Sequence, residues 1–327
     1  MSSGNGEPLR IGILGAARIA PPALISPARA TGAAQVVAVA ARDQTRATAY
    51  AIEHAIPIAL NSYEDLIDHP EVDAIYNALP PSRHADLTLA ALAAGKPVLC
   101  EKPFAMNESE ARTMVEAAQA QGLVLMEAFH YRYHPLFARV LEICASGEIG
   151  AVRRMEAVFT TSIPDTGAEL RYDPALGGGA LMDLGTYCLH WSRTVAGAEP
   201  LAARAESVLS ASGVDVSTHA ILAFPGGVIA ELTCDMAGPV RASLEITGLE
   251  GRLKVINPLA PQLGHLIEVV REGGTSRRET ASREPTYDFQ LRAFVAAVRG
   301  EAAPLTGGAD AVAQMAAIDA IKAAIAA

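Results

Sequence analysis

The sequence predicts an α/β unit followed by an α+β unit whose open-faced sheet is mostly antiparallel. In the first 130 residues, apolar runs of strand length alternate with segments of helical spacing. Beyond Gly150, apolar and polar residues alternate along most runs, which is typical of strands buried on one face. Two turn sequences, Pro225–Gly227 and Leu249–Gly251, join such runs as hairpin turns would.

The first unit has the alternation of strands and helices that produces a parallel sheet. We expect it to occupy residues 1–130. Asn107 followed by Glu110 is the pattern of a helix N-cap with its reciprocal partner. The strand-like runs are Leu9–Leu14, Val36–Ala40, Ala74–Leu79, Lys96–Cys100 and Val124–Ala128. The helical segments are Thr45–His54, Tyr63–Asp68, His84–Ala94 and Glu108–Gln121.

The second unit, residues 131–327, is expected to build the antiparallel sheet, with helices over one of its faces. Helices are expected at Pro135–Cys144, where the units join, at Phe289–Arg299, and from Ala309 to the end. We expect the last helix to return toward the first unit. The strand-like runs are Val152–Phe159, Ala205–Leu209, His219–Phe224, Val228–Cys234, Ala242–Thr247 and Arg252–Ile256.

The composition narrows the classes of function. Half of the 327 residues are hydrophobic, 19% are charged, and the net charge is −10. An acidic balance repels phosphate backbones, so we expect no nucleic-acid partner. No apolar run reaches the roughly 18 residues of a membrane span, and the four cysteines have no metal-ligand spacing. We therefore expect a cytoplasmic protein with neither a membrane anchor nor a bound metal.

The turn from Gly15 to Ala20 has the position of a dinucleotide-binding turn, between a strand and a helix. In that context backbone N–H groups lie against a diphosphate. Ala17 stands where the usual pattern has its second glycine, so the match is incomplete. Because any tight turn needs small residues, the motif alone supports a nucleotide site and a packed turn about equally. For a nucleotide, we expect Gly15, Ala17, Arg18 and Ile19 to bind it.

Arg42 follows the second strand, at the position that distinguishes the two nicotinamide nucleotides. NAD-binding proteins usually carry a carboxylate there for the ribose 2′-hydroxyl, whereas a guanidinium pairs well with the 2′-phosphate of NADP. Arg42 therefore favours NADP, with NAD as the alternative because Asp43 follows it. Asp43 either contacts a ribose or caps the next helix.

Two further loops follow strands at the carboxyl edge of the predicted sheet, where ligands bind in such folds. Pro80 and His84 follow one strand, and Glu101 and Lys102 follow the next. We expect these residues near the nucleotide. The alternative for His84 is a helix-start histidine that follows a Ser82 cap.

A run of three glycines, Gly177–Gly179, precedes Asp183 and Tyr187. Such a run lets the backbone approach a flat group, the nicotinamide or another chain segment, closely. Residues four apart on a helix share a face, so Asp183 and Tyr187 would project together, with His190 near them. The alternatives are that Tyr187 is a packed core aromatic and Asp183 a helix-start carboxylate.

Lys102 and Tyr187 together suggest proton transfer. An ammonium group near a phenol favours the phenolate, which lets the tyrosine exchange a proton nearer neutral pH. With a nucleotide-binding turn in the same chain, this pair is typical of a dehydrogenase, in which hydride goes to the cofactor and a proton goes to Tyr187.

These motifs resemble the Gfo/Idh/MocA oxidoreductases, and within them the NADP-linked sugar 1-dehydrogenases and dihydrodiol dehydrogenases. The resemblance covers nearly the whole chain. Its most specific part is Glu101-Lys-Pro together with Asp183-Leu-Gly-Thr-Tyr187. The runs that carry it are Gly12–Ala20, Ala38–Asp43, Glu101–Pro103, Glu127–Pro135, Arg171, Pro174 and Leu176–Tyr187.

The resemblance implies a Rossmann domain and an open-faced sheet whose other side often serves assembly, here as a dimer or tetramer. It implies that Tyr187 is the catalytic acid and base. Lys102 then binds near the nicotinamide ribose and tunes Tyr187, and Asp183 is an acidic residue on the substrate side.

The resemblance also points to residues around the substrate. Arg132, His134 and Arg171 are candidates to bind substrate hydroxyls, with structural ion pairs as the alternative. His130 stands where close relatives usually carry an apolar residue, so the substrate pocket is expected to differ there.

We therefore expect an NADP-dependent dehydrogenase or reductase that acts on a hydroxyl or carbonyl of a sugar or cyclic diol. The alternative is an NADP-binding regulator without catalysis. Because a regulator has no need of Lys102 and Tyr187, the presence of both favours the enzyme.

Overall fold

The computed structural model describes residues 6–326, which form two compact units. The first unit contains the chain up to His130 together with Tyr287–Val312. The second contains Tyr131–Thr286 and the chain from Ala313 onward. Of the two helices near the C-terminus, α8 (Thr286–Val298) belongs almost entirely to the first unit. Most of the last helix, α9 (Ala309–Ala326), belongs to the second.

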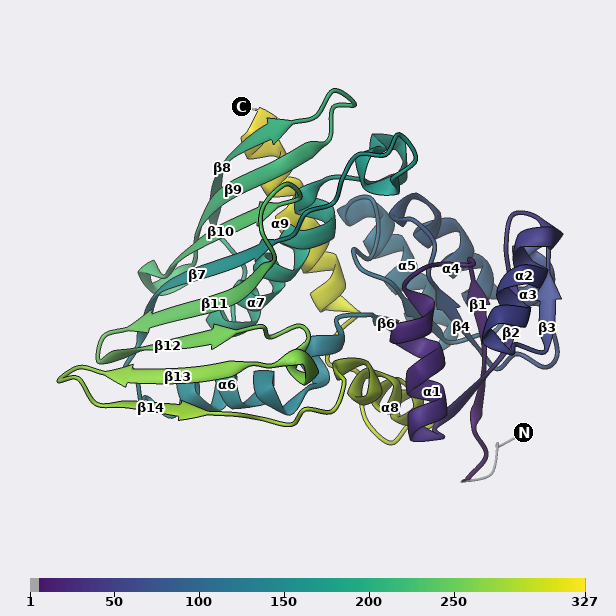
Figure 1. The fold of residues 1–327 in the computed structure, drawn as a ribbon, viewed down its shortest axis with the longest axis horizontal. Coiled ribbons are helices and arrows are strands. Elements are labelled where there is room, and N and C mark those ends of the chain that lie inside the picture. Colours follow the sequence, from purple (N-terminus) through teal and green to yellow (C-terminus); the bar gives the residue numbers. More distant parts are fainter. Residues whose placement is uncertain (1–5, 327) are drawn as a thin grey trace. The chain divides into compact units, whose positions relative to one another are not determined.

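The strands of the first unit pair in parallel, in the order β3-β2-β1-β4-β5-β6 (Figure 1). Strands β4 and β5 are buried throughout, which is why their residues form apolar runs. Strand β3 is short and only half-buried, and it escaped the sequence pattern for that reason. The strands are β1 (Leu9–Leu14), β2 (Ala34–Ala40), β3 (Ile58–Leu60), β4 (Ala74–Asn77), β5 (Val98–Cys100) and β6 (Leu125–Glu127).

Three helices of the first unit begin at the predicted residues Tyr63, His84 and Glu108, and another begins one residue early, at Gln44. The helix at Ser26–Thr31 was not predicted. The Asn107 carboxamide oxygen accepts the Glu110 N–H at 3.0 Å, which confirms the predicted cap, and the Glu110 carboxylate accepts the Met106 N–H. None of the helices in residues 6–326 combines the length and apolar character that a membrane span requires. Besides α8, the helices are α1 (Ser26–Thr31), α2 (Gln44–His54), α3 (Tyr63–Ile67), α4 (His84–Ala93) and α5 (Glu108–Gln121).

The order of this sheet reverses beside β1. The chain runs from β1 to β2 and β3 on one side, then crosses to β4 on the other side. Because the strands are parallel, the loops after β1, β2, β4 and β5 all leave from one edge. A reversal of this kind is where doubly wound sheets bind nucleotides. The first residues of these loops include Gly15, Ala41, Ala78 and Glu101.

The second unit contains a mostly antiparallel sheet in the order β14-β13-β12-β11-β7-β10-β9-β8 (Figure 1). Strands β7 and β10 pair in parallel, and both predicted hairpins, β9–β10 and β11–β12, are antiparallel pairs. The mostly apolar strand β13 and the charged strand β14 were not predicted. The strands are β7 (Val152–Thr160), β8 (Ala202–Leu209), β9 (Asp215–Ala223), β10 (Ile229–Asp235), β11 (Arg241–Gly248), β12 (Gly251–Ile256), β13 (Leu266–Arg271) and β14 (Ser276–Glu279).

Helices cover one face of this sheet. Along β10, Ala230, Leu232 and Cys234 are buried and alternate with half-exposed residues. Helix α7 (Thr186–Ala196) packs against β7 and β10, and helix α6 (Pro135–Ala145) lies farther along the sheet (Figure 1). The predicted fold class, a parallel sheet followed by a mostly antiparallel one, is confirmed.

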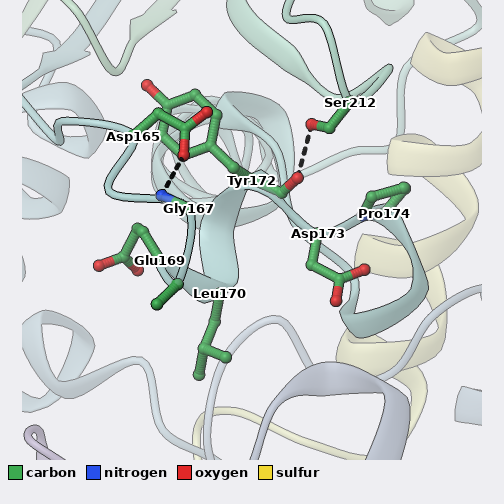
Figure 2. Close-up of a pocket in the computed structure, with 9 residues that line it drawn as sticks. Asp165, Gly167, Glu169, Leu170, Tyr172, Asp173, Pro174 and Ser212 are labelled. Carbon is green, nitrogen blue, oxygen red and sulfur yellow. Dashed lines mark hydrogen bonds between the residues drawn. The ribbon is translucent and has the colours of Figure 1, made fainter.

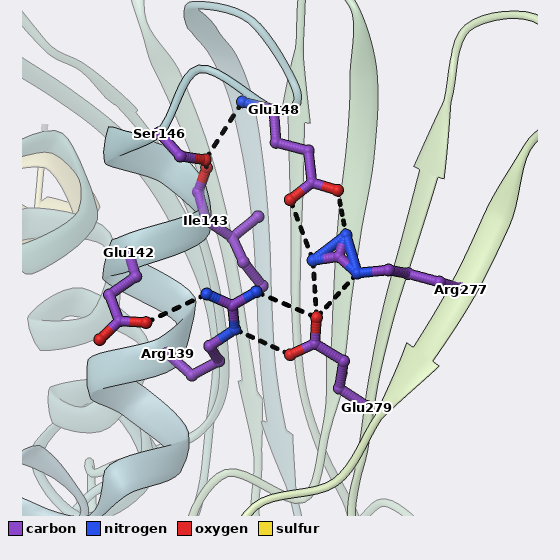
Figure 3. A network of polar contacts seen from close by, with 7 residues as sticks. All are labelled: Arg139, Glu142, Ile143, Ser146, Glu148, Arg277 and Glu279. Atoms are coloured by element: carbon purple, nitrogen blue, oxygen red, sulfur yellow. Dashed lines mark hydrogen bonds and ion pairs between the residues drawn. The ribbon is translucent and has the colours of Figure 1, made fainter.

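A network of arginines and glutamates joins α6 to the edge strand β14 (Figure 3). Arg139 on α6 donates from Nε and Nη2 to the two carboxylate oxygens of Glu279, at 2.8 and 3.1 Å. Arg277 on β14 pairs with Glu148 and with Glu279. Two guanidinium groups therefore share Glu279, and the hydrogen bonds from Arg139 above all lower the pKa of its carboxyl.

Glu279→Gln should destabilise the protein most at neutral pH. A carboxyl whose pKa is lowered by folding stabilises the folded state above its unfolded pKa, and this contribution is lost as pH falls through the folded value. We expect a loss of about 1 kcal/mol in the free energy of unfolding at pH 7 and a smaller loss in acid, measured by urea unfolding. Glu142→Gln, which removes a more exposed partner of Arg139, is the control. A pH-independent effect of Glu279→Gln would contradict this account.

Candidate active site

The turn after β1 requires glycine at position 15. Gly15 has φ +99°, which L side chains rarely adopt, and a Cβ there would lie 2.9 Å from Leu79 Cδ2. Its N–H donates to the Ala40 carbonyl at the end of β2, at 2.9 Å. The turn is thus held close to the loops after β2 and β4. This geometry, at the reversal of a parallel sheet, fits a nucleotide diphosphate.

Arg42 lies exposed just after β2, and Asp43 caps α2. The Asp43 carboxylate accepts the N–H of Arg46 at 2.8 Å. Of the two roles expected for Asp43, the structure shows helix capping. Asp43 is therefore occupied by the backbone of α2, whereas the neighbouring Arg42 is exposed and does not cap the helix.

Further arginines lie around Tyr63, and the sequence had not pointed to them. The guanidinium carbon of Arg83 lies 5.8 Å from the centre of the Tyr63 ring. Burial raises the pKa of the Tyr63 hydroxyl, and the charges of Arg83, Arg42 and Arg46 oppose that rise. Several cations and an aromatic ring therefore lie near one another in the first unit, an arrangement that suits an anionic group attached to a planar base.

His84 joins two loops of the carboxyl edge. It is fully buried at the start of α4, with Nε2 2.7 Å from the Leu79 carbonyl and Nδ1 3.0 Å from the Pro103 carbonyl. Burial lowers the pKa of His84, and the charge of Lys102 lowers it further. Both ring nitrogens face backbone oxygens. The ring therefore positions the two loops that contain Pro80 and Lys102. Ser82, the expected cap, does not bond to this helix start.

Glu101 anchors the loop that carries Lys102. The Tyr76 hydroxyl donates to one oxygen of the buried Glu101 carboxylate at 2.6 Å, and the Lys102 N–H donates to the other at 3.3 Å. The peptide bond between Lys102 and Pro103 is cis. Glu101 thus fixes the backbone of the loop, and the Lys102 side chain is partly exposed beyond it.

In the second unit, the glycine run approaches another segment of the chain. A Cβ on Gly178 would lie 2.5 Å from the Arg171 carbonyl oxygen. Gly179 has φ +115°, and a Cβ there would collide with the Asp215 carboxylate. Of the two partners expected for this run, the structure therefore shows a chain segment.

Asp215, at the start of β9, holds the helix that follows these glycines. One oxygen of its carboxylate accepts the Leu181 N–H and the Thr218 hydroxyl, each at 2.7 Å. Leu181 begins a π-helical turn, Leu181–Gly185, which continues into α7. Burial raises the pKa of Asp215. No local motif marks Asp215 as the anchor of this helix, because Leu181 lies 34 residues away in the sequence.

Asp183 is paired with Arg171. Its carboxylate accepts from Arg171 Nε at 2.5 Å, and Arg171 Nη1 donates to Glu169 at 3.0 Å. Burial alone would lower the pKa of Arg171, but these two carboxylates raise it. The structural ion pair expected as the alternative for Arg171 is therefore present. Asp183 lies in the π-helical turn and Tyr187 in α7, so their spacing is not that of one regular α-helix.

Tyr187 lies in a cluster of aromatic side chains. It is 6% exposed, and its ring centre lies 5.7 Å from Phe159, 6.2 Å from Tyr131 and 6.4 Å from Trp191. The Tyr131 hydroxyl and His190 Nδ1 are 2.5 Å apart. The ring of Tyr187 is thus held by packing on several sides, which limits where its hydroxyl can lie.

Two other predicted substrate residues have structural partners. His134 is buried and caps α6, with Nδ1 accepting the Leu136 N–H at 3.0 Å, and burial lowers its pKa. The guanidinium of Arg132 lies 5.9 Å from the Phe137 ring centre. His130, in the first unit, is buried with its ring 4.1 Å from that of Tyr287.

A pocket of about 360 Å³ is lined mainly by the segment from Asp165 to Pro174 (Figure 2). Its lining includes Glu169, which binds Arg171, and two further carboxylates, Asp165 and Asp173. The Ser212 hydroxyl closes one side by donating to the Tyr172 carbonyl at 2.6 Å. Within residues 6–326, His, Cys, Asp and Glu side chains form no cluster suited to a metal ion.

Comparison with known proteins decides the family. Residues 9–129 match an oxidoreductase family with an NAD-binding Rossmann fold, and residues 137–254 match the GFO/IDH/MocA C-terminal domain. The chain belongs to the GFO/IDH/MocA oxidoreductase family. It is an oxidoreductase with an NAD(P)-binding Rossmann domain, as its motifs predicted.

Individual relatives are named dehydrogenases and reductases. The chain is 34% identical over 318 residues to D-xylose 1-dehydrogenase (NADP(+)) 2 of Haloferax volcanii, covering 96% of each protein. It is 38% identical over 225 residues to trans-1,2-dihydrobenzene-1,2-diol dehydrogenase of Sus scrofa, covering 68% of this chain and 67% of that protein. KijD10, a 3-ketoreductase from Actinomadura kijaniata solved with NADP, is 29% identical with a TM-score of 0.88 over 97% of each chain.

Gly179→Ala should destabilise the fold far more than Gly197→Ala. Both glycines have positive φ, but a Cβ at Gly197 would meet open space, whereas one at Gly179 would displace Asp215. We expect a loss of at least about 3 kcal/mol for Gly179→Ala and about 1 kcal/mol for Gly197→Ala, measured by urea unfolding. Equal losses would show that the contact between Gly179 and Asp215 has no special weight.

Proposed function

We propose that the protein is an NADP-dependent dehydrogenase or reductase that acts on a hydroxyl or carbonyl group of a sugar or cyclic diol. The observation that carries the proposal is that one chain contains both Lys102 and Tyr187, each on a segment that hydrogen bonds hold in place. Lys102 follows an anchored strand end in the Rossmann unit, and Tyr187 stands on the anchored helix α7 in the second unit. The names of the relatives support the same substrate class.

The residues at the carboxyl edge of the first sheet fit the nucleotide. Gly15, Ala17, Arg18 and Ile19 form the turn for the diphosphate, because that turn follows β1 at the reversal of the sheet. Pro80 and Glu101 stand at the ends of the neighbouring strands. When bound, NADP supplies the nicotinamide ring that accepts or donates a hydride.

Arg42 is proposed to bind the 2′-phosphate of NADP. It is exposed at the end of β2, and its charge acts on Tyr63 together with those of Arg46 and Arg83. A planar guanidinium offers parallel N–H donors to phosphate oxygens, which a ribose hydroxyl cannot match. The cluster therefore favours NADP over NAD.

Tyr187 is proposed to move the proton of the reaction. During oxidation its phenolate takes the proton of the substrate hydroxyl, and during reduction its hydroxyl returns a proton to the carbonyl oxygen. The ammonium of Lys102 is proposed to favour the phenolate electrostatically. Asp183 is proposed to orient the substrate hydroxyl, with Arg171 holding its carboxylate in place. Arg132 is the remaining candidate for a substrate contact, since His134 caps a helix.

Tyr187→Phe should lower kcat by about 100-fold or more, because it removes the proton-transfer group and keeps the ring. NADPH binding, measured by fluorescence, should stay within about twofold of wild type. A panel of aldoses, inositols and cyclic diols with NADP would reveal the substrate. Tyr172→Phe, which removes a hydroxyl bonded to the Ile163 carbonyl, is the control. Unchanged turnover in Tyr187→Phe would contradict the proposed role, and wild-type binding without turnover of any compound would favour a regulator.

Arg42→Ala should abolish the preference for NADP. We expect the Kd for NADPH to rise roughly tenfold or more, because a charged hydrogen bond is lost, and the Kd for NADH to change little. Arg112→Ala, at an exposed ion pair on α5, should alter neither. Equal weakening of both nucleotides by Arg42→Ala would mean that Arg42 does not contact the 2′-phosphate.

A further inference from the structure

Two side chains of α2 hold consecutive carbonyl groups of the turn after β1. Arg46 Nη2 donates to the Ala16 carbonyl at 2.9 Å, and the Tyr50 hydroxyl donates to the Ala17 carbonyl at 2.9 Å. Arg46 and Tyr50 are four residues apart on a helix, so they share one face. One face of α2 thus binds two successive peptide units of the turn.

These bonds, together with one from the Ala20 N–H to the Ala17 carbonyl at 3.2 Å, fix the direction in which the N–H groups of the two peptide units point. In a planar trans peptide the N–H is directed opposite to the carbonyl. With the carbonyls of Ala16 and Ala17 bonded to α2, the N–H groups of Ala17 and Arg18 point away from that helix. Successive N–H groups on one side of a turn form a concavity that binds anions.

The contact between α2 and the turn is tightly packed. Ala16, Ala41 and Ala47 form a buried cluster, and Tyr50 packs against it. The rings of Tyr50 and His54 also form a T-shaped pair, with ring centres 4.4 Å apart. Small side chains allow the helix to come close enough for the Tyr50 hydroxyl to reach the backbone of the turn. Burial raises the pKa of Tyr50 to about 12, so its hydroxyl stays a donor throughout the physiological range.

We propose that Tyr50, together with Arg46, is a positioning residue that orients the N–H groups of Ala17 and Arg18 toward the diphosphate of the nucleotide. This inference rests on the proposed function. It also gives a reason why the turn works with Ala17 in place of the usual second glycine. The turn has less backbone freedom than a glycine turn, and side chains of α2 fix it in the binding conformation.

If the proposal is right, loss of the Tyr50 hydroxyl should weaken the binding of ligands that contain a diphosphate and spare ligands that lack one. ADP-ribose contains the diphosphate, whereas adenosine 2′-monophosphate carries only the phosphate expected at Arg42. Tyr50→Phe keeps the packed ring and removes only the hydroxyl. The full-length wild type and variant would be titrated calorimetrically with both compounds, and thermal unfolding would be followed in parallel.

We expect Tyr50→Phe to raise the Kd of ADP-ribose about fivefold and to leave that of adenosine 2′-monophosphate within about twofold. Gln44→Met is the matched control. It removes a side-chain bond from the same helix to the Ala59 carbonyl, which lies outside the turn, and should alter neither Kd. Arg42→Ala should show the reverse pattern, with a weaker 2′-monophosphate and a nearly unchanged ADP-ribose.

Two results would overturn the role of Tyr50. Unchanged ADP-ribose affinity in Tyr50→Phe would show that the turn does not need the bond, and equal weakening of both compounds would show a general structural role. Failure of the wild type to bind either compound or NADPH would instead refute the proposed function, and the role of Tyr50 with it.

Discussion

Parallel hydrogen bonding of the first sheet is the constraint on which the nucleotide half of the protein depends. Since β1, β2, β4 and β5 run in one direction, the loops that carry Gly15, Arg42, Pro80 and Lys102 leave from one edge. Each loop is then fixed by a contact to a neighbour. The Gly15 N–H bonds to the end of β2, and His84 and Glu101 hold the loops after β4 and β5.

The sheet of the second unit is mostly antiparallel, and the candidate residues Asp183 and Tyr187 stand on an anchored helical segment beside it. Asp215 binds the first N–H of the π-helical turn that leads to Tyr187, and α9 supports the following helix. Gln314 on α9 donates to the carbonyl of Thr186 on α7 at 2.8 Å, and it accepts a hydrogen bond from Arg193 on α7 at 2.8 Å. Buried polar groups of this kind are costly to leave unbonded, so the satisfied network fixes one position of the helix.

Several polar residues that were expected near ligands bind the backbone of the protein. Asp43 and His134 cap helices, and both ring nitrogens of His84 face carbonyl oxygens. A polar residue at the edge of a sheet has the same sequence context whether it faces a ligand or an open backbone group. Backbone groups at helix starts and loop ends need partners in any fold, and nearby polar side chains supply them.

The sequence by itself determined the fold class, the strong strands and the cap at Asn107, because periodicity and caps act over a few residues. The family followed from the resemblance of its short motifs. The sequence missed β3, which is short and half-buried, and the charged strand β14, and it also missed β13 although the run Leu266–Arg271 is mostly apolar. Only the tertiary structure decided that Asp215 anchors the Tyr187 helix, that Arg171 pairs with Asp183, and that Tyr50 reaches the turn after β1. These contacts join residues from 12 to 34 positions apart, and only folding of the chain brings such partners together.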